Sequence, residues 1–152
     1  MKIIAIISAL LLIGVAVTAI WVRSAPARAE DWHVDPEDKG LRQGPDWAIF
    51  CPAPGTRWAG PGPADLDRMD AIALAWPRTM RAFGSPDEGR TTYVTRTRLM
   101  GFPDYTTVSR QAETGDICIL GRQRYGLRDG GVNRRRVGAW AQSYLGSHER
   151  PF

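Results

Sequence analysis

The fold is decided by the stretch TTYVTRTRLMGFPDYTTVSRQAETGDICILGRQRY, residues 91–125. Polar and apolar residues alternate along it with a period of two, which is the pattern of β-strands. Two short turn sequences interrupt the alternation, Gly101-Phe102-Pro103-Asp104 and Ala112-Glu113-Thr114-Gly115. Loops this short join antiparallel neighbours. With one more strand before them, we predict a four-stranded antiparallel meander over residues 79–84, 91–100, 105–111 and 116–125.

Helical periodicity flanks the meander. Apolar residues recur at helical spacing from Asp65 to Trp76, and Pro77 ends the pattern. A second apolar stripe covers residues 133–145, where Asn133 is the expected N-terminal cap. Residues 47–51 have the composition of one further short strand. The prediction is an α+β fold with an N-terminal and a C-terminal helix packed on one face of the sheet.

The N-terminus carries a membrane signal. Residues 3–22 contain no charged side chain. About 20 apolar residues are enough for a helix to cross a hydrocarbon core of about 30 Å. Two interpretations stay open, an uncleaved transmembrane anchor or a secretory signal cleaved at a small-residue site such as Ala27-Arg28-Ala29. Either one places the following domain outside the cytoplasm.

The apolar run also sets the expected domain organisation. Residues 23–46 are rich in Pro, Ala and charge and show no apolar period, which is typical of a tether. We therefore expect an anchor or signal over residues 1–24, a tether over 25–46, a single α+β domain over 47–146 and a tail over 147–152.

The two cysteines, Cys51 and Cys118, match no metal-binding spacing. In an oxidising compartment they can form one disulfide, and the alternative is a pair of buried free thiols. The sequence predicts neither a metal site nor a cofactor.

Charge is distributed unevenly along the chain. Residues 30–90 hold 7 Lys and Arg against 11 Asp and Glu, whereas residues 91–145 hold 9 Arg against 4 Asp and Glu. Such a basic half favours an anionic partner. The alternative is that the acidic half packs against the basic half.

Two Arg-x-Arg pairs, Arg96/Arg98 and Arg122/Arg124, lie near the ends of predicted strands. In a meander these two strand ends meet at the same edge of the sheet. The last loop leads from that edge to the start of the final helix, whose backbone N–H groups favour anions. Guanidinium groups suit phosphate, sulfate and carboxylate. The candidate ligand site comprises Arg96, Arg98, Asp104, Arg122, Arg124, Asp129, Asn133 and Arg136. The alternative is an internal network in which the two aspartates neutralise the arginines.

Catalytic machinery is scarce in the sequence. His33 lies in the predicted tether and His148 in the tail, and there is no nucleophile elbow or phosphate loop. Asp104 and Asp129 are conceivable paired acids, but the neighbouring arginines are expected to lower their pKa. A non-enzymatic role is therefore favoured. Nucleic acid is not an expected partner, because the apolar segment places the domain away from cytoplasmic nucleic acid.

The arginine motifs also carry a family resemblance. The segments are Tyr93-Val94-Thr95-Arg96-Thr97-Arg98-Leu99, Phe102-Pro103-Asp104-Tyr105 and Arg122-x-Arg124-Tyr125-Gly126-x-x-Asp129-x-Gly131-Val132-Asn133-x-x-Arg136-Val137. They resemble the bacterial domain of unknown function family DUF1499, over roughly residues 33–145. Gly121 departs from the family pattern, which commonly has serine there. The resemblance implies an envelope or membrane-associated protein without an established activity. The expected location is the inner membrane with the domain facing the periplasm, or the periplasm after cleavage near Ala29.

Together these features predict a membrane-tethered, non-enzymatic module that binds an anionic envelope ligand such as a lipid headgroup. The alternative is a scaffold or assembly factor for an envelope complex, with Trp58 and the Pro- and Gly-rich loop at 52–63 as its contact surface. A hydrolase that uses Asp104 or Asp129 is the third interpretation.

Overall fold

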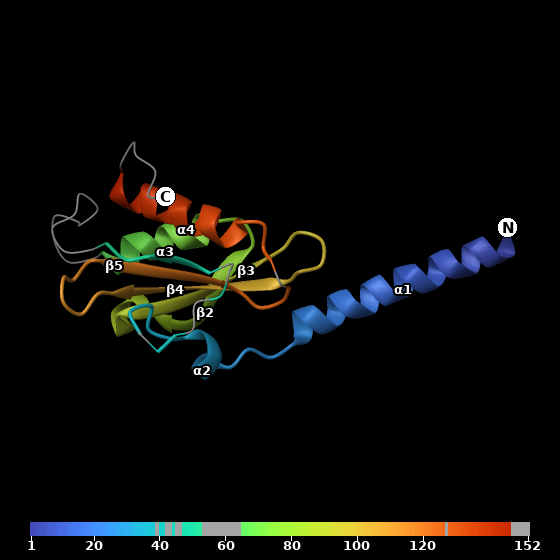
Figure 1. The fold of residues 1–152 in the computed structure, drawn as a ribbon, viewed down its shortest axis with the longest axis horizontal. Coiled ribbons are helices and arrows are strands. Elements are labelled where there is room, and N and C mark those ends of the chain that lie inside the picture. Colours follow the sequence, from blue (N-terminus) through green and yellow to red (C-terminus); the bar gives the residue numbers. More distant parts are fainter. Residues whose placement is uncertain (39, 42–43, 45–46, 53–64, 127, 147–152) are drawn as a thin grey trace.

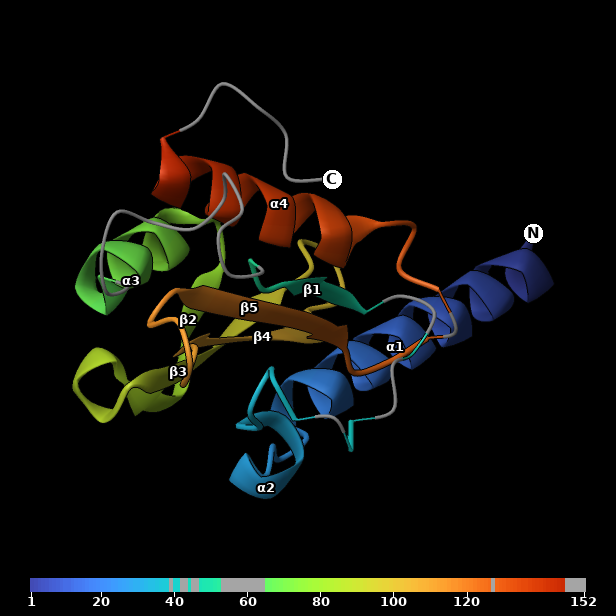
Figure 2. The same ribbon diagram turned by 60° about the vertical axis from the view of Figure 1, so that its left-hand side comes forward.

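The computed structural model describes residues 1–38, 40–41, 44, 47–52, 65–126 and 128–146. Its globular part has three layers (Figures 1 and 2): two helices, a twisted sheet, and a segment of the chain that runs under the sheet. The first helix extends away from these layers (Figure 1). The elements are α1 (Lys2–Ser24), α2 (Ala29–Trp32), β1 (Ala48–Phe50), α3 (Leu66–Ala75), β2 (Thr79–Ser85), η1 (Pro86–Glu88), β3 (Arg90–Arg96), β4 (Pro103–Arg110), β5 (Ile117–Gln123) and α4 (Val132–Leu145).

The predicted α+β fold is confirmed, with one more strand than predicted. The strands β2 to β5 form the antiparallel meander, and β1 pairs antiparallel with β5, giving the order β1-β5-β4-β3-β2. The sheet thus has five strands, not four. Because β1 is only three residues long, it is too short to show a period of two, and its strand conformation depends on β5.

The strand predicted over 91–100 ends earlier, at Arg96. The chain turns there because the Thr97 amide bonds to the Phe102 carbonyl at 3.0 Å and the Gly101 amide bonds to the Thr97 carbonyl at 3.2 Å. The last four residues of the predicted strand, 97–100, therefore belong to the turn Thr97–Phe102.

Helices α3 and α4 pack on one face of the sheet, as predicted (Figure 2). Asp65 caps α3 by accepting a hydrogen bond from the Arg68 amide at 2.9 Å. On α4, Trp140 meets Tyr93 of β3 edge to face, with ring centroids 5.5 Å apart. Burial of these apolar surfaces is the main stabilising contribution. The core residues are Ala48, Phe50, Leu66, Met69, Ala73, Tyr93, Val108, Ile117, Ile119, Val137, Trp140 and Ala141.

A buried carboxylate fixes α3 to the sheet. Asp70 accepts hydrogen bonds from Arg81 of β2, through Nε at 2.6 Å and through Nη2, and from the Tyr93 hydroxyl at 2.9 Å. The Arg81 hydrogen bond lowers the pKa of Asp70. Because its acceptors are satisfied, this buried acid can stay ionised next to the core.

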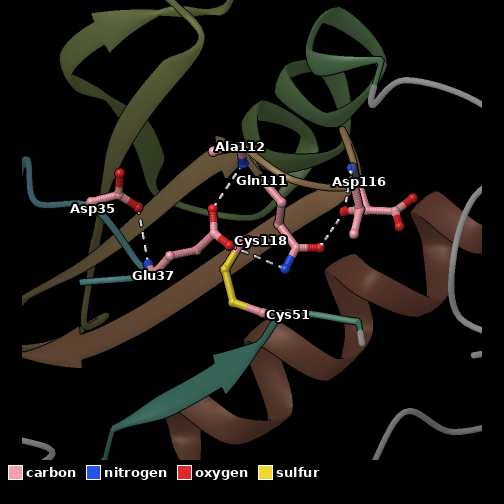
Figure 3. The surroundings of a disulfide bond; sticks show 8 residues. Asp35, Glu37, Cys51, Gln111, Ala112, Asp116 and Cys118 are labelled. Atoms are coloured by element: carbon pink, nitrogen blue, oxygen red, sulfur yellow. Dashed lines mark hydrogen bonds between the residues drawn. A yellow bond between two sulfur atoms is a disulfide. The ribbon is translucent and has the colours of Figure 1, made fainter. Parts of the chain in front are cut away.

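The two cysteines form a disulfide at the start of β5 (Figure 3). The register that places Phe50 opposite Ile119 places Cys51 opposite Cys118, and their Cα atoms are 4.3 Å apart. The Glu37 carboxylate lies beside them and accepts from the Ala112 amide at 3.1 Å (Figure 3). The disulfide ties short β1 to the centre of the fold.

We expect reduction of this disulfide to destabilise the domain. Closing a loop of 67 residues removes unfolded-state freedom worth about 2–4 kcal/mol. The thermal midpoint of the full chain should fall in the presence of a reductant. A Cys51→Ser/Cys118→Ser variant should match the reduced protein and no longer respond to the reductant. Equal midpoints for the oxidised and reduced chain would contradict this expectation.

Candidate functional site

The C-terminal ends of β3 and β5 lie at one edge of the sheet. The register pairs Arg96 with Pro103 and Asp104 with Gln123, so these residues form rows across β3, β4 and β5. We call this the arginine edge. It is also the edge at which the turn Thr97–Phe102 connects β3 to β4.

Six of the eight predicted site residues are divided between the two faces of the sheet, and the other two, Arg98 and Asp129, lie in loops. Side chains alternate along each strand, and Gly121 of β5 faces Val137 and Asn133 of α4. Arg122 and its pairing partner Tyr105 therefore point to the opposite face, and so does Arg124. We call the α3 and α4 side the helix face and the opposite side the linker face. The linker face carries Arg96, Arg122 and Arg124, and the helix face carries Asp104, Asn133 and Arg136.

The linker face is covered by residues 25–38, which we call the linker segment. The Trp32 ring stacks on Tyr105 with centroids 4.2 Å apart, and the Trp32 carbonyl accepts a hydrogen bond from Thr107 at 2.9 Å. His33 Nδ1 lies 2.9 Å from the Thr92 hydroxyl, and Asp35 pairs with Arg90 at 2.7 Å. The segment that the sequence describes as a tether thus packs along the sheet. The predicted boundary between tether and domain stays a prediction.

Arg122 is the centre of this contact. Its guanidinium is buried and donates from Nη2 to the Trp32 carbonyl at 2.8 Å. The same guanidinium lies over the Trp32 ring at 4.9 Å and over the Trp47 ring at 5.3 Å, which are cation–π distances. Burial lowers the pKa of Arg122, and Asp31 opposes this shift. Arg122 therefore holds the linker segment against the sheet.

The two other arginines of the linker face also donate to backbone carbonyls at the start of the globular part. Arg124 reaches Ala25 at 3.2 Å and Pro26 at 2.7 Å. Arg96 reaches Gly101 at 3.0 Å and Arg23 at 3.5 Å. These contacts connect the end of α1 to the sheet.

On the helix face, the side chain of Arg136, a residue of α4, is fully buried. It donates to Thr106 through Nε at 3.2 Å, to Asp104 through Nη1 at 3.5 Å, and to the Asn133 side-chain oxygen through Nη2. The pKa of Asp104 is raised, because burial outweighs the opposing effect of Arg136. The expected net lowering of the pKa of this carboxyl is therefore wrong, although Arg136 acts in the expected direction.

Asp129, not Asn133, caps the final helix. The Asp129 carboxylate accepts hydrogen bonds from the amides of Gly131 and Asn133, both at 2.7 Å. The N-cap is Gly131 with φ of 76°, and Asn133 lies inside the helix with its side chain buried. The predicted cap at Asn133 is wrong because Asp129 reaches the same N–H groups from the preceding turn.

A cavity of about 380 Å³ opens at the arginine edge on the helix side. Its lining includes two carboxylates and one guanidinium, that of Arg128, and none of the five arginines predicted for the site. Among the described residues, no group of three His, Cys, Asp or Glu side chains could hold a metal ion. The lining residues are Thr97, Phe102, Asp104, Gln123, Tyr125, Gly126, Arg128, Asp129 and Val132.

A different arginine cluster forms where α1 meets the arginine edge. Arg23, the penultimate residue of α1, donates to the Leu99 carbonyl at 2.8 Å, and Arg96 donates to the Arg23 carbonyl. Arg98 is exposed in the same turn. We call Arg23, Arg96 and Arg98 the anchor cluster. Within the described part of the chain, none of the three pairs with a carboxylate. Arg23 was missing from the prediction because it lies about 70 residues away in sequence.

We expect an Arg122→Gln substitution to loosen the linker segment. It removes a charge-assisted hydrogen bond and two cation–π contacts, together on the order of 2 kcal/mol. Amide hydrogen exchange in residues 29–35 should then be about 30-fold faster, while β4 stays protected. Arg98→Gln, which removes an exposed arginine of the same sheet edge, is the control and should leave this exchange unchanged. A parallel loss of protection in β4 would mean that Arg122 supports the whole domain instead.

The linker segment should also loosen as the pH falls. Burial and then Arg90 lower the pKa of His33 below its ordinary value of 6.5. The unfolded segment therefore binds more protons than the packed one, and the contribution of His33 is fully present above pH 6.5 and declines below it. Exchange protection of residues 29–35, corrected for intrinsic rates, should therefore fall as the pH drops below about 6.5. A His33→Gln variant should not show this fall.

Comparison with known proteins identifies the family but no activity. The model of a family described as protein of unknown function (DUF1499) matches residues 54–143, more than half of the 152-residue chain. This match confirms the resemblance carried by the arginine motifs, while its extension back to residue 33 stays a prediction. No curated protein and no solved structure matches. The chain belongs to the DUF1499 family of proteins of unknown function.

Proposed function

We propose that this chain is a membrane-anchored, non-enzymatic module that binds a phosphate-, sulfate- or carboxylate-bearing ligand at the anchor cluster, Arg23, Arg96 and Arg98. The observation that carries the proposal is that three arginines lie where α1 meets the turn, and that none of them pairs with a carboxylate among the described residues. Arg23 and Arg96 donate hydrogen bonds to backbone carbonyls. Each guanidinium has five N–H donors, so donors are left for an anion.

The position of the cluster suits such a ligand. In α1 the apolar run ends at Trp21 and Val22, and Arg23 follows. The Trp21 ring lies 5.8 Å from Tyr125, whose ring also lies 6.0 Å from Phe102. Trp and Tyr favour the boundary between membrane and water, and Arg near the end of a span favours the headgroups. A phosphate group at this level comes from a lipid headgroup or from a soluble anion.

The contacts of the linker segment support a retained anchor. Arg96 and Arg124 bond to the carbonyls of Arg23, Ala25 and Pro26. Cleavage near Ala29 would remove all three acceptors. We therefore favour an uncleaved α1 in the inner membrane, with the domain on the periplasmic side. Within the described residues, α1 is long and apolar enough to cross a membrane, although a signal sequence meets the same criterion.

The remaining interpretations receive less support. Both Asp129 oxygens bond to backbone amides, and Asp104 contacts Arg136, so a hydrolytic role has no free pair of acids. The scaffold interpretation relied on Trp58 and the loop at 52–63, and residues 53–64 lie outside the described residues. Anion binding at the anchor cluster is therefore the proposed function.

The test is thermal unfolding of the full chain in neutral detergent micelles, with phosphate, sulfate or glycerol phosphate against chloride at equal ionic strength. Binding at ten times the dissociation constant adds about 1.4 kcal/mol, a rise of several degrees in the midpoint. We expect Arg96→Gln/Arg98→Gln to lose this rise and still unfold cooperatively.

The matched control is Arg134→Gln/Arg135→Gln, which also removes two charges but from exposed positions on α4. It should keep the response to anions. A response that is lost equally in both variants would indicate general charge screening, and an absent response in the unsubstituted chain would refute the anion site.

A further inference from the structure

The turn Thr97–Phe102 presents apolar side chains beside α1. Leu99 at its tip is 83% exposed, and Met100 follows it. Figure 1 shows this turn, between β3 and β4, extending from the sheet on the side where α1 lies. A single exposed leucine is unremarkable on a soluble surface. Next to a helix that can cross a membrane, however, an exposed leucine can contact lipid.

Met100 lies level with the apolar part of α1. It lines one groove of about 510 Å³ together with Ile7, Leu10, Leu11, Gly14, Val15 and Thr18. At a rise of 1.5 Å per residue, Thr18 and Gly14 lie about 7 and 13 Å before Arg23 along the helix. Any bilayer that surrounds this part of α1 therefore also meets Met100.

The turn is held at this place by the end of α1. Arg23 bonds to the Leu99 carbonyl at 2.8 Å, and Arg96 bonds to the Gly101 carbonyl at 3.0 Å. Gly101 has φ of 76°, and a Cβ atom there would come within 2.7 Å of the Arg23 side chain. Only glycine allows this close approach without strain. The turn and the helix end thus form one packed unit.

We infer that the turn Thr97–Phe102 is a second membrane contact, in which Leu99 and Met100 enter the hydrocarbon layer beside α1. Arg23 and Arg98 then lie at the level of the headgroups, where cationic side chains are favoured. The partner is a lipid bilayer, and its acyl chains cover the apolar groove between α1 and the turn. The inference depends on the retained anchor of the proposed function but not on anion binding.

The test uses the full chain reconstituted into phosphatidylcholine vesicles, with and without phosphatidylglycerol. Cys51 and Cys118 are joined in a disulfide, so a single introduced cysteine can carry an environment-sensitive fluorophore. Labels at Leu99→Cys and Met100→Cys should be quenched several-fold more by brominated acyl chains than by aqueous iodide. Glu113→Cys, an exposed position in the turn between β4 and β5, is the control and should show the reverse.

The outcomes separate the two proposals. Quenching of both turn labels by acyl chains in phosphatidylcholine alone supports membrane insertion even if no anion raises the thermal midpoint. Insertion that needs phosphatidylglycerol and disappears in Arg96→Gln/Arg98→Gln supports it as well, and adds that headgroup phosphates hold the turn. Labels at Leu99 and Met100 that iodide quenches as strongly as the Glu113 label overturn the inference, whatever the anion screen shows.

Discussion

The hydrogen bond from the buried Arg122 guanidinium to the Trp32 carbonyl is the contact on which the arrangement of the molecule depends. A sheet with helices on only one face needs a cover for the other. Here the cover is the linker segment, and it has little apolar surface of its own apart from Trp32. A buried guanidinium is costly unless its donors are used. The Trp32 carbonyl takes Arg122 and Thr107, while the indole ring lies against both Arg122 and Tyr105. One residue of the linker thus accepts a hydrogen bond from the buried guanidinium and covers the sheet, while the buried Nε of Arg122 has no hydrogen-bond partner among the described residues.

This contact also determines how the domain sits relative to α1. The linker segment follows α1 directly, and Arg96 and Arg124 bind the carbonyls between the helix and α2. A flexible tether would let the domain rotate freely, whereas a packed linker lets only one edge of the sheet face the end of α1. The anchor cluster and the turn Thr97–Phe102 acquire a defined position relative to the end of α1 for this reason. Loss of the linker contact would therefore leave the side chains of the anchor cluster and of the turn unchanged. It would no longer fix their position relative to α1.

The amino-acid sequence was sufficient to predict the strands and helices whose apolar residues recur with a clear period. The meander and both helices follow from alternation and helical spacing, with bounds within a few residues except where β3 ends early. It was insufficient where a long-range partner decides the structure. A short strand was expected at residues 47–51, but its pairing with β5 was not. The linker segment looked irregular because its order comes from Arg122 rather than from its own period. Likewise, sequence spacing could not predict that Arg23 lies beside Arg96. The register that places Arg122 and Arg136 on opposite faces of the sheet could not be predicted either, because it depends on how the strands pair.

Particular ion pairs show how the charges of the acidic half and of the basic half are compensated. Asp70 and Asp35 of the acidic half pair with Arg81 and Arg90, which belong to the same half. In the basic half, Arg136 contacts Asp104, and Arg122 is neutralised by no carboxylate in its hydrogen bonds. Burial makes these last two arginines structural, because a ligand cannot reach them without unpacking α4 or the linker. Among the described arginines at the arginine edge of the sheet, Arg98 in the turn and Arg128 beside the cavity remain exposed. The two Arg-x-Arg pairs thus differ: Arg122 and Arg124 both bond to the linker segment, whereas Arg96 bonds to the end of α1 and to the turn, and Arg98 is exposed in that turn.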